Sequence, residues 1–102
     1  MTEALLMINL LAARQKADEL SGIARRLRTA VNNEINSEAN TIASAWQGEA
    51  GNKYVRKLRQ QSGDLLSIAG QFDAIAATIR SVAQSYYNAE LRAIQIAKNS
   101  RI

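Results

Sequence analysis

Apolar residues recur every three or four positions along almost the whole of this chain, and the pattern breaks once, near the middle. Before the break the repeat runs from Leu6 to Ile42, and after it the repeat resumes at Val55 and reaches Ile96. Steps of three and four place such residues on one face of a helix. The sequence has no proline, the residue that most often interrupts a helix. The pattern therefore predicts an all-α protein with two long helices.

The break is the stretch Trp46-Gln47-Gly48, which is followed closely by Gly51. Glycine adopts positive φ at little cost, so two glycines this close together suit a chain reversal. We assign Trp46 and Gly48 to the turn. We expect one helix over residues 3–45, a turn over 46–52 and a second helix over 52–98, folded as a two-helix antiparallel hairpin in a single domain of residues 1–102.

The first helix carries one irregularity. Its apolar steps alternate between four and three except around Val31, where steps of four follow one another. Such a slip disturbs a heptad repeat locally. The residues from Asn32 to Asn40 are rich in Asn, Ser and Glu, which lowers helix propensity. We therefore expect a looser helix in this stretch.

The apolar face of the second helix is too wide for one partner helix to cover, because three neighbouring rows repeat every seven residues. A lone hairpin would leave much of this face in water, so we expect two hairpins to form a four-helix bundle, as a homodimer or with another helical protein. Gly63 and Gly70 add a row of small residues that permits close helix approach. We assign the core or dimer seam to the central row and to two leucines of the first helix: Leu20, Leu27, Leu58, Leu65, Phe72 and Ile79.

The composition excludes several chemistries. The chain has no cysteine and no histidine, which removes thiolate metal sites, the commonest metal ligand and the commonest general base. We expect no catalytic residue, no metal, no cofactor and no small-molecule substrate. The apolar stretch from Ala4 to Ala13 is preceded by Glu3 and lacks a basic region, so we assign it to the first helix and not to a cleaved signal peptide. No apolar run reaches the ~20 residues of a membrane span, and we expect no stable membrane insertion.

Basic residues cluster on both sides of the break. We favour a solvated helix face over a nucleic-acid site, because acidic residues are interspersed elsewhere and no aromatic platform accompanies the arginines. A basic helical nucleic-acid-binding protein stays open as a distant alternative, and so does a membrane-active protein that uses the stretch Ala4 to Ala13. The clustered cations are Arg25, Arg26, Arg28, Lys53, Arg56, Lys57 and Arg59.

Tyr86 and Glu90 lie four residues apart, so both side chains project from one face of the second helix. Glu90 continues an apolar row that includes Ala76 and Ala83, where a buried carboxylate would be costly. We expect the bundle to end near Glu90 and to leave an aromatic ring and a carboxylate exposed together. Alternatively, Tyr86 is a core residue with its hydroxyl at the surface.

With Trp46-Gln47-Gly48 at a central turn and Tyr86-Tyr87-Asn88-Ala89-Glu90 late in the second helix, the chain resembles the WXG (ESAT-like) family of type VII secretion proteins. The resemblance covers nearly the whole chain. It implies a helical hairpin that forms homodimeric or heterodimeric four-helix bundles and is exported without a cleaved signal peptide by a membrane ATPase. It also implies that Tyr86 and Glu90 form the secretion signal, beside the Trp-x-Gly turn of the partner.

The resemblance leaves two related functions open. The protein is itself exported to the medium or the cell surface from the cytoplasm, or it is the dedicated partner that targets a larger LXG-type toxin to the same machine. Two departures from the family pattern favour an additional binding surface. The chain continues past Glu90, with Ile94 and Ile96, and its N-terminus is unusually apolar.

Overall fold

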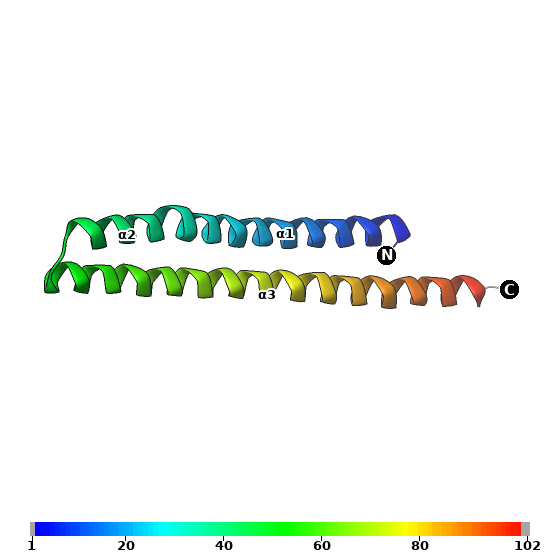
Figure 1. The fold of residues 1–102 in the computed structure, drawn as a ribbon. Coiled ribbons are helices and arrows are strands. Elements are labelled where there is room, and N and C mark those ends of the chain that lie inside the picture. The colour runs from blue at the N-terminus through cyan, green and yellow to red at the C-terminus, as the bar shows by residue number, and fades with distance from the viewer. Residues whose placement is uncertain (1, 101–102) are drawn as a thin grey trace. The chain divides into compact units, whose positions relative to one another are not determined.

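The computed structural model describes residues 2–100, and all regular structure within them is helical (Figure 1). Helix α1 covers Glu3–Ala30, the π-helical segment η1 covers Val31–Ile35, α2 covers Asn36–Ala45 and α3 covers Glu49–Asn99. The predicted all-α helical hairpin is confirmed. The ends of the expected domain, Met1, Arg101 and Ile102, lie outside the described residues.

The turn is shorter than predicted, because α3 begins at Glu49. Only Trp46, Gln47 and Gly48 separate α2 from α3, and Gly48 alone adopts positive φ, at +119°. The Gly48 carbonyl accepts a hydrogen bond from the Asn52 N–H at 2.9 Å, which starts the new helix. Gly51 therefore lies in the first turn of α3 and not in the reversal.

The slip around Val31 is a π-helical turn within an otherwise continuous helix. The Asn36 N–H donates to the Val31 carbonyl, five residues back. Successive apolar residues four apart rotate gradually away from one face of an α-helix. The wider π turn brings them back to the buried face. Val31 and Ala39 are therefore both fully buried although eight residues separate them, and Ile35 between them is half-buried. The expected loosening takes the form of a change in hydrogen-bond register.

The described residues pack as two compact units. Unit 1 contains the residues up to Leu20 and those from Ala74 onward, and unit 2 is Ser21–Asp73, so α1 and α3 each contribute to both. In each unit, polar contacts join residues of the two segments in antiparallel order. In unit 1 these contacts are Glu3–Lys98, Arg14–Gln84 and Asp18–Arg80, and in unit 2 they are Arg28–Asp73 and Asn40–Arg59. The assignment of residues 1–102 to a single domain stays a prediction.

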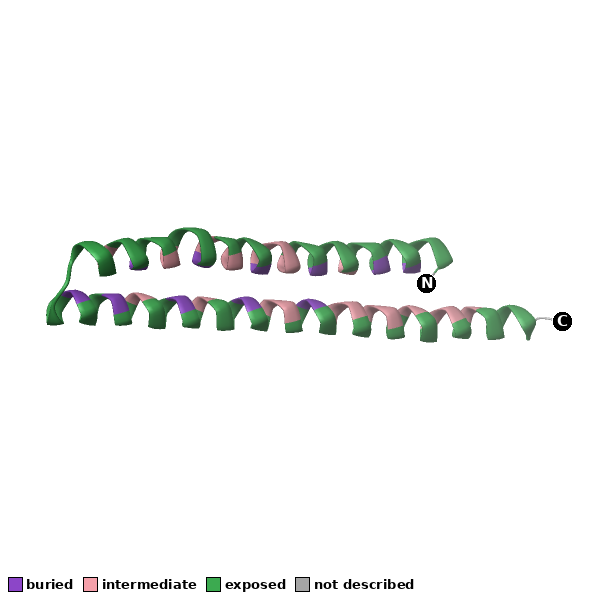
Figure 2. Cartoon of the chain, in the orientation of Figure 1, coloured by how far each residue is buried: buried purple, intermediate pink, exposed green. Residues whose placement is uncertain are grey.

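Small side chains make up most of the buried core, together with two leucines and two valines. In Figure 2 the buried positions recur along one side of each helix, and on α3 they end at Ala76. On α3 this row of buried residues is one of the two rows that flank the predicted seam. All six residues assigned to the seam, on α1 and α3 together, are half-buried. Alanine, serine and glycine in the centre allow helix backbones to approach closely, which leaves larger residues at the edges. The buried residues are Leu6, Leu10, Ala17, Ala24, Val31, Ala39, Gly51, Val55, Ser62, Ala69 and Ala76.

Gly63 and Gly70 do not mediate close helix packing within either unit. A Cβ atom added at either position would meet no atom within 4 Å. Replacing either by alanine should raise the free energy of unfolding by about 0.5–1 kcal/mol, because glycine in a helix interior costs conformational entropy. Chemical denaturation of the single variants checks this expectation. A loss of stability would instead show that the row packs against a second chain.

Candidate functional site

Tyr86 and Glu90 lie on α3 in unit 1, on a helix that continues beyond them. Tyr86 is 50% exposed and Glu90 is half-buried. The sequence suggested that the bundle ends near Glu90, but it does not end there. Leu91 and Ile94 are also half-buried, and the Lys98 Nζ lies 2.8 Å from the Glu3 Oε1. An exposed Tyr86 agrees with its interpretation as a docking residue, whereas the carboxylate beside it is only partly accessible.

Three polar contacts between the two segments of unit 1 lie on one side of α3. Arg80 Nη2 lies 2.9 Å from Asp18 Oδ1, and Arg14 Nη2 donates to Gln84 Oε1 at 2.5 Å. At 100° per residue, Arg80, Gln84 and Lys98 fall on one side of α3, whereas Ile75, Val82 and Tyr86 fall on the other. One side of unit 1 is therefore closed by polar pairs, and the other is apolar.

The apolar side is hollowed into a groove of about 280 Å³. Tyr86 is part of its wall, so the candidate signal and the groove share a residue. The sequence pattern predicted that this face is too wide for one partner helix, but it could not show that two segments far apart in the chain enclose a groove. The residues that line the groove are Leu6, Asn9, Leu10, Ala13, Val82, Ala83, Tyr86 and Tyr87.

Unit 1 also carries most of the large apolar side chains that remain exposed. Val82 is 62% exposed and Ile75 is 48% exposed, and both lie on the groove side of α3. Exposed large apolar side chains beside a groove often mark an interaction site. The exposed large apolar residues of unit 1 are Leu5, Met7, Ile8, Leu11, Ile75, Val82, Tyr86 and Ile96.

The turn of unit 2 presents a pair of aromatic rings. The ring centroids of Trp46 and Tyr54 lie 6.0 Å apart, with the ring planes tilted by 39°. Both side chains are about half exposed. Sequence reasoning missed Tyr54, although its position in the second turn of a helix that begins just after Trp46 would have placed it at the same end of unit 2. A second hollow, of about 240 Å³, is lined by Tyr54, Lys57, Leu58 and Gln61.

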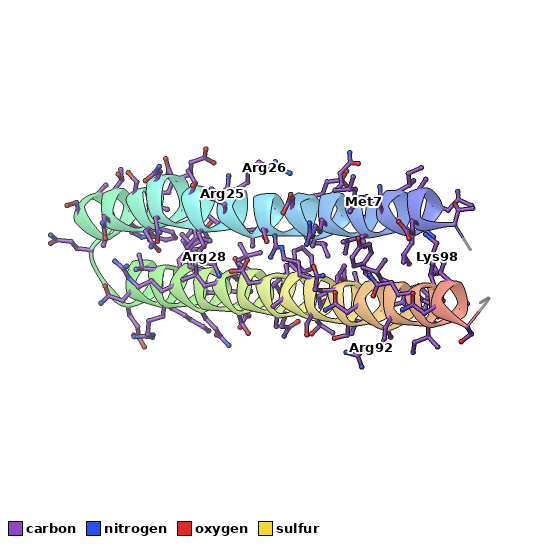
Figure 3. All side chains as sticks on the ribbon, turned by 90° about the vertical axis from the view of Figure 1, so that its right-hand side faces the viewer. Met7, Arg25, Arg26, Arg28, Arg92 and Lys98 are labelled. Atoms are coloured by element: carbon purple, nitrogen blue, oxygen red, sulfur yellow. The ribbon has the colours of Figure 1, made fainter. Side chains whose placement is uncertain are left out.

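Some of the basic residues contact a polar side chain on the other segment of their unit, and others project outward. Arg28 Nη2 lies 2.6 Å from Asp73 Oδ2, and Arg59 Nη2 donates to Asn40 Oδ1 at 2.8 Å. In Figure 3, Arg26 projects from the outer side of α1 and Arg92 from the outer side of α3, and Arg25 is also exposed. Within the part of the chain that the structure describes, acidic side chains form no group of three that could hold a metal ion. None of the described helices is long and apolar enough to cross a membrane.

Comparison with known proteins agrees with this geometry. The family model WXG100, described as proteins of 100 residues with WXG, matches residues 5–91. The chain belongs to the WXG100 family. No curated protein and no solved structure matches it. WXG100 proteins are small non-catalytic helical proteins that are exported by type VII secretion, and they typically pair with themselves or with other WXG or LXG proteins.

The matched range includes Trp46, Gly48, Tyr86 and Glu90, and it ends one residue after Glu90. The helical segment from Arg92 to Asn99 lies outside the matched range, and it packs in unit 1 through Ile94 and Lys98. Because this segment is helical and docked, Tyr86 and Glu90 lie within a folded helix and not in a free tail.

Proposed function

We propose that this WXG100 protein is exported by, or targets a partner to, a type VII secretion system, and that it acts through dimerisation and a signal formed by Tyr86 and Glu90. The observation that carries the proposal is the position of Tyr86, half exposed on the wall of an apolar groove in a chain of this family. The secretion ATPase is the expected partner of the signal.

A signal built on a helix has a physical advantage for recognition. Tyr86 and Glu90 are one helical turn apart, so α3 fixes the spacing between the phenol and the carboxylate. A receptor that binds both groups loses little affinity to ordering them, because they are already ordered.

The same groove supports pairing with a second helical hairpin. A partner that covers Ile75 and Val82 removes from water two side chains that the chain itself leaves about half exposed. Burial of the exposed half of such a side chain contributes roughly 1 kcal/mol. We propose a homodimeric four-helix bundle, and the alternative is a bundle with a helical segment of an LXG-type toxin. Light scattering on the purified protein distinguishes them, since the second arrangement leaves the protein alone without a stable dimer.

The signal is tested by measuring the fraction of protein exported to the medium by cells that carry the secretion system. Tyr86→Ala and Glu90→Gln should each lower this fraction roughly 10- to 100-fold, the effect of losing a hydrogen bond to a charged group. The melting temperature of each purified variant should change little, because Tyr86 is half exposed and Glu90 pairs with no described residue.

Val82→Ala is the matched control for Tyr86→Ala, because Val82 lines the same groove one turn earlier. If it impairs export as strongly, the groove matters as a packing surface and Tyr86 is not a separate signal. Glu34→Gln, at an exposed carboxylate in unit 2, is the control for Glu90→Gln. Normal export of both signal variants would rule out the assignment.

A further inference from the structure

A surface of unit 2 that the proposed export function does not use is both basic and aromatic. We call it the turn-end patch and define it as Trp46, Lys53, Tyr54, Arg56 and Lys57, all of which are exposed. Trp46 and Tyr54 are 50% and 47% exposed, and their ring centroids are 6.0 Å apart. Two large aromatic side chains that remain half in water at the same turn suggest an occupant outside the chain.

The cations of the turn-end patch have no ion pair with any described residue, in contrast to Arg28, which binds Asp73. Spacings of three and four place Lys53, Arg56 and Lys57 together on the outer face of α3. Glu49 is the only acidic residue from Ala39 to Gly63, and α3 begins there, so the positive end of its helix dipole adds to the local potential. The patch is therefore complementary to an anionic surface.

The apolar surroundings of the patch indicate what kind of anionic surface it fits. Ala43, Ala45 and Ala50 are exposed on either side of the turn, so the end of unit 2 carries small apolar side chains around Trp46. Tryptophan and tyrosine prefer the boundary between water and lipid, where the ring is partly buried and the polar atom stays hydrated. Lysine and arginine beside them bind anionic headgroups.

We propose that the turn-end patch docks this protein on the surface of an anionic lipid bilayer. The three cations contact the headgroups, and the rings of Trp46 and Tyr54 lie at headgroup depth. The contact is peripheral, as no described helix is able to cross a membrane. This places the membrane-facing surface at the turn and not in the apolar stretch Ala4–Ala13, which carries no basic residue before Arg14.

Nucleic acid is a poorer fit to the same residues. The two rings are tilted by 39° and do not form a parallel platform for bases. The three cations lie within about one and a half turns of α3, which is short for a surface that follows a phosphate backbone. An acidic protein would satisfy the cations but gives no role to the exposed alanines around the turn.

The emission of Trp46 tests the proposal directly, because it is the only tryptophan of the chain. Vesicles of mixed phosphatidylcholine and phosphatidylglycerol should shift the emission to the blue and carry the protein upward in flotation. Vesicles of phosphatidylcholine alone should do neither. The triple variant Lys53→Gln/Arg56→Gln/Lys57→Gln should bind the mixed vesicles roughly 100-fold more weakly, because each lysine or arginine near an anionic surface adds about one factor of five.

The matched control is the triple variant Arg25→Gln/Arg26→Gln/Arg92→Gln, which removes the same charge from exposed sites outside the patch (Figure 3). Circular dichroism establishes that both variants are folded. Tyr54→Ala should also weaken binding while the blue shift of Trp46 reports it. The proposal is overturned if both triple variants lose binding equally or if pure phosphatidylcholine binds as well. It is also overturned if a DNA duplex or polyglutamate binds through the patch and the mixed vesicles do not.

Discussion

Replacing Gly51 by alanine should lower the melting temperature by about 10 °C, a large effect for the addition of a single methyl group. Gly51 is buried in the first turn of α3, directly against Trp46. A Cβ atom at this position would overlap the Trp46 carbonyl oxygen and lie 2.9 Å from its Cγ. The backbone must then shift, and such overpacking costs about 2 kcal/mol or more. In a domain of this size, 1 kcal/mol corresponds to roughly 4–8 °C.

Two other glycines make this prediction specific. Gly48→Ala introduces no contact within 4 Å but must hold an alanine at a φ of +119°, so it tests backbone strain alone. Gly63→Ala introduces neither a contact nor strain and should stabilise the protein. Thermal unfolding by circular dichroism compares all three variants. An unchanged melting temperature for Gly51→Ala would mean that the Trp46 carbonyl moves freely, and would contradict the tight turn.

The same glycine shows what the sequence could and could not predict about the turn. The position of the reversal followed from Trp46, Gly48 and the break in periodicity. The role of Gly51 did not follow, because a glycine that supplies positive φ and one that allows a close approach look alike in a sequence. The π-helical turn was predictable only as a slip, since steps of four fit either a shifted α-helical face or a widened turn.

The three apolar rows predicted on α3 did not indicate which row the chain itself buries. Periodicity gave three neighbouring apolar rows. The row that faces the centre of each unit holds small residues such as Ala69 and Ala76, whereas large residues of the predicted seam, such as Leu65 and Phe72, are half-buried beside it. Hydrophobicity favours the large residues for the core, but two helices pack most closely where side chains are small. That choice depends on the partner segment and cannot be made from one helix.

Substitution by aspartate at two adjacent residues of α3 should have different effects. At one residue it should unfold the chain, and at the other it should leave the fold intact and affect only dimerisation. Ala76 is fully buried in unit 1, whereas Ile75 is 48% exposed on the groove side. Ala76→Asp places a carboxylate in the core with no partner, which costs several kcal/mol and should unfold the protein. Ile75→Asp places the same carboxylate in water, and the free energy of unfolding of the isolated chain should change by less than about 1 kcal/mol.

Ile75→Asp should nevertheless dissociate the proposed homodimer. In a two-fold symmetric bundle the substitution occurs twice, so two carboxylates lose water and two apolar contacts are lost at one interface. We expect the dissociation constant to rise at least roughly 100-fold. Light scattering over a concentration series should show a monomer, and the melting temperature should no longer depend on protein concentration.

The combination of outcomes decides which surface the partner covers. A folded monomer for Ile75→Asp and an unfolded chain for Ala76→Asp would establish the groove side as the dimer interface. A dimer that persists in Ile75→Asp would place the interface elsewhere, for example along the exposed row of Gly63 and Gly70. If the wild-type protein is already monomeric, the apolar groove side binds a different helical partner. Ile75→Asp would then abolish binding to that partner without changing the fold.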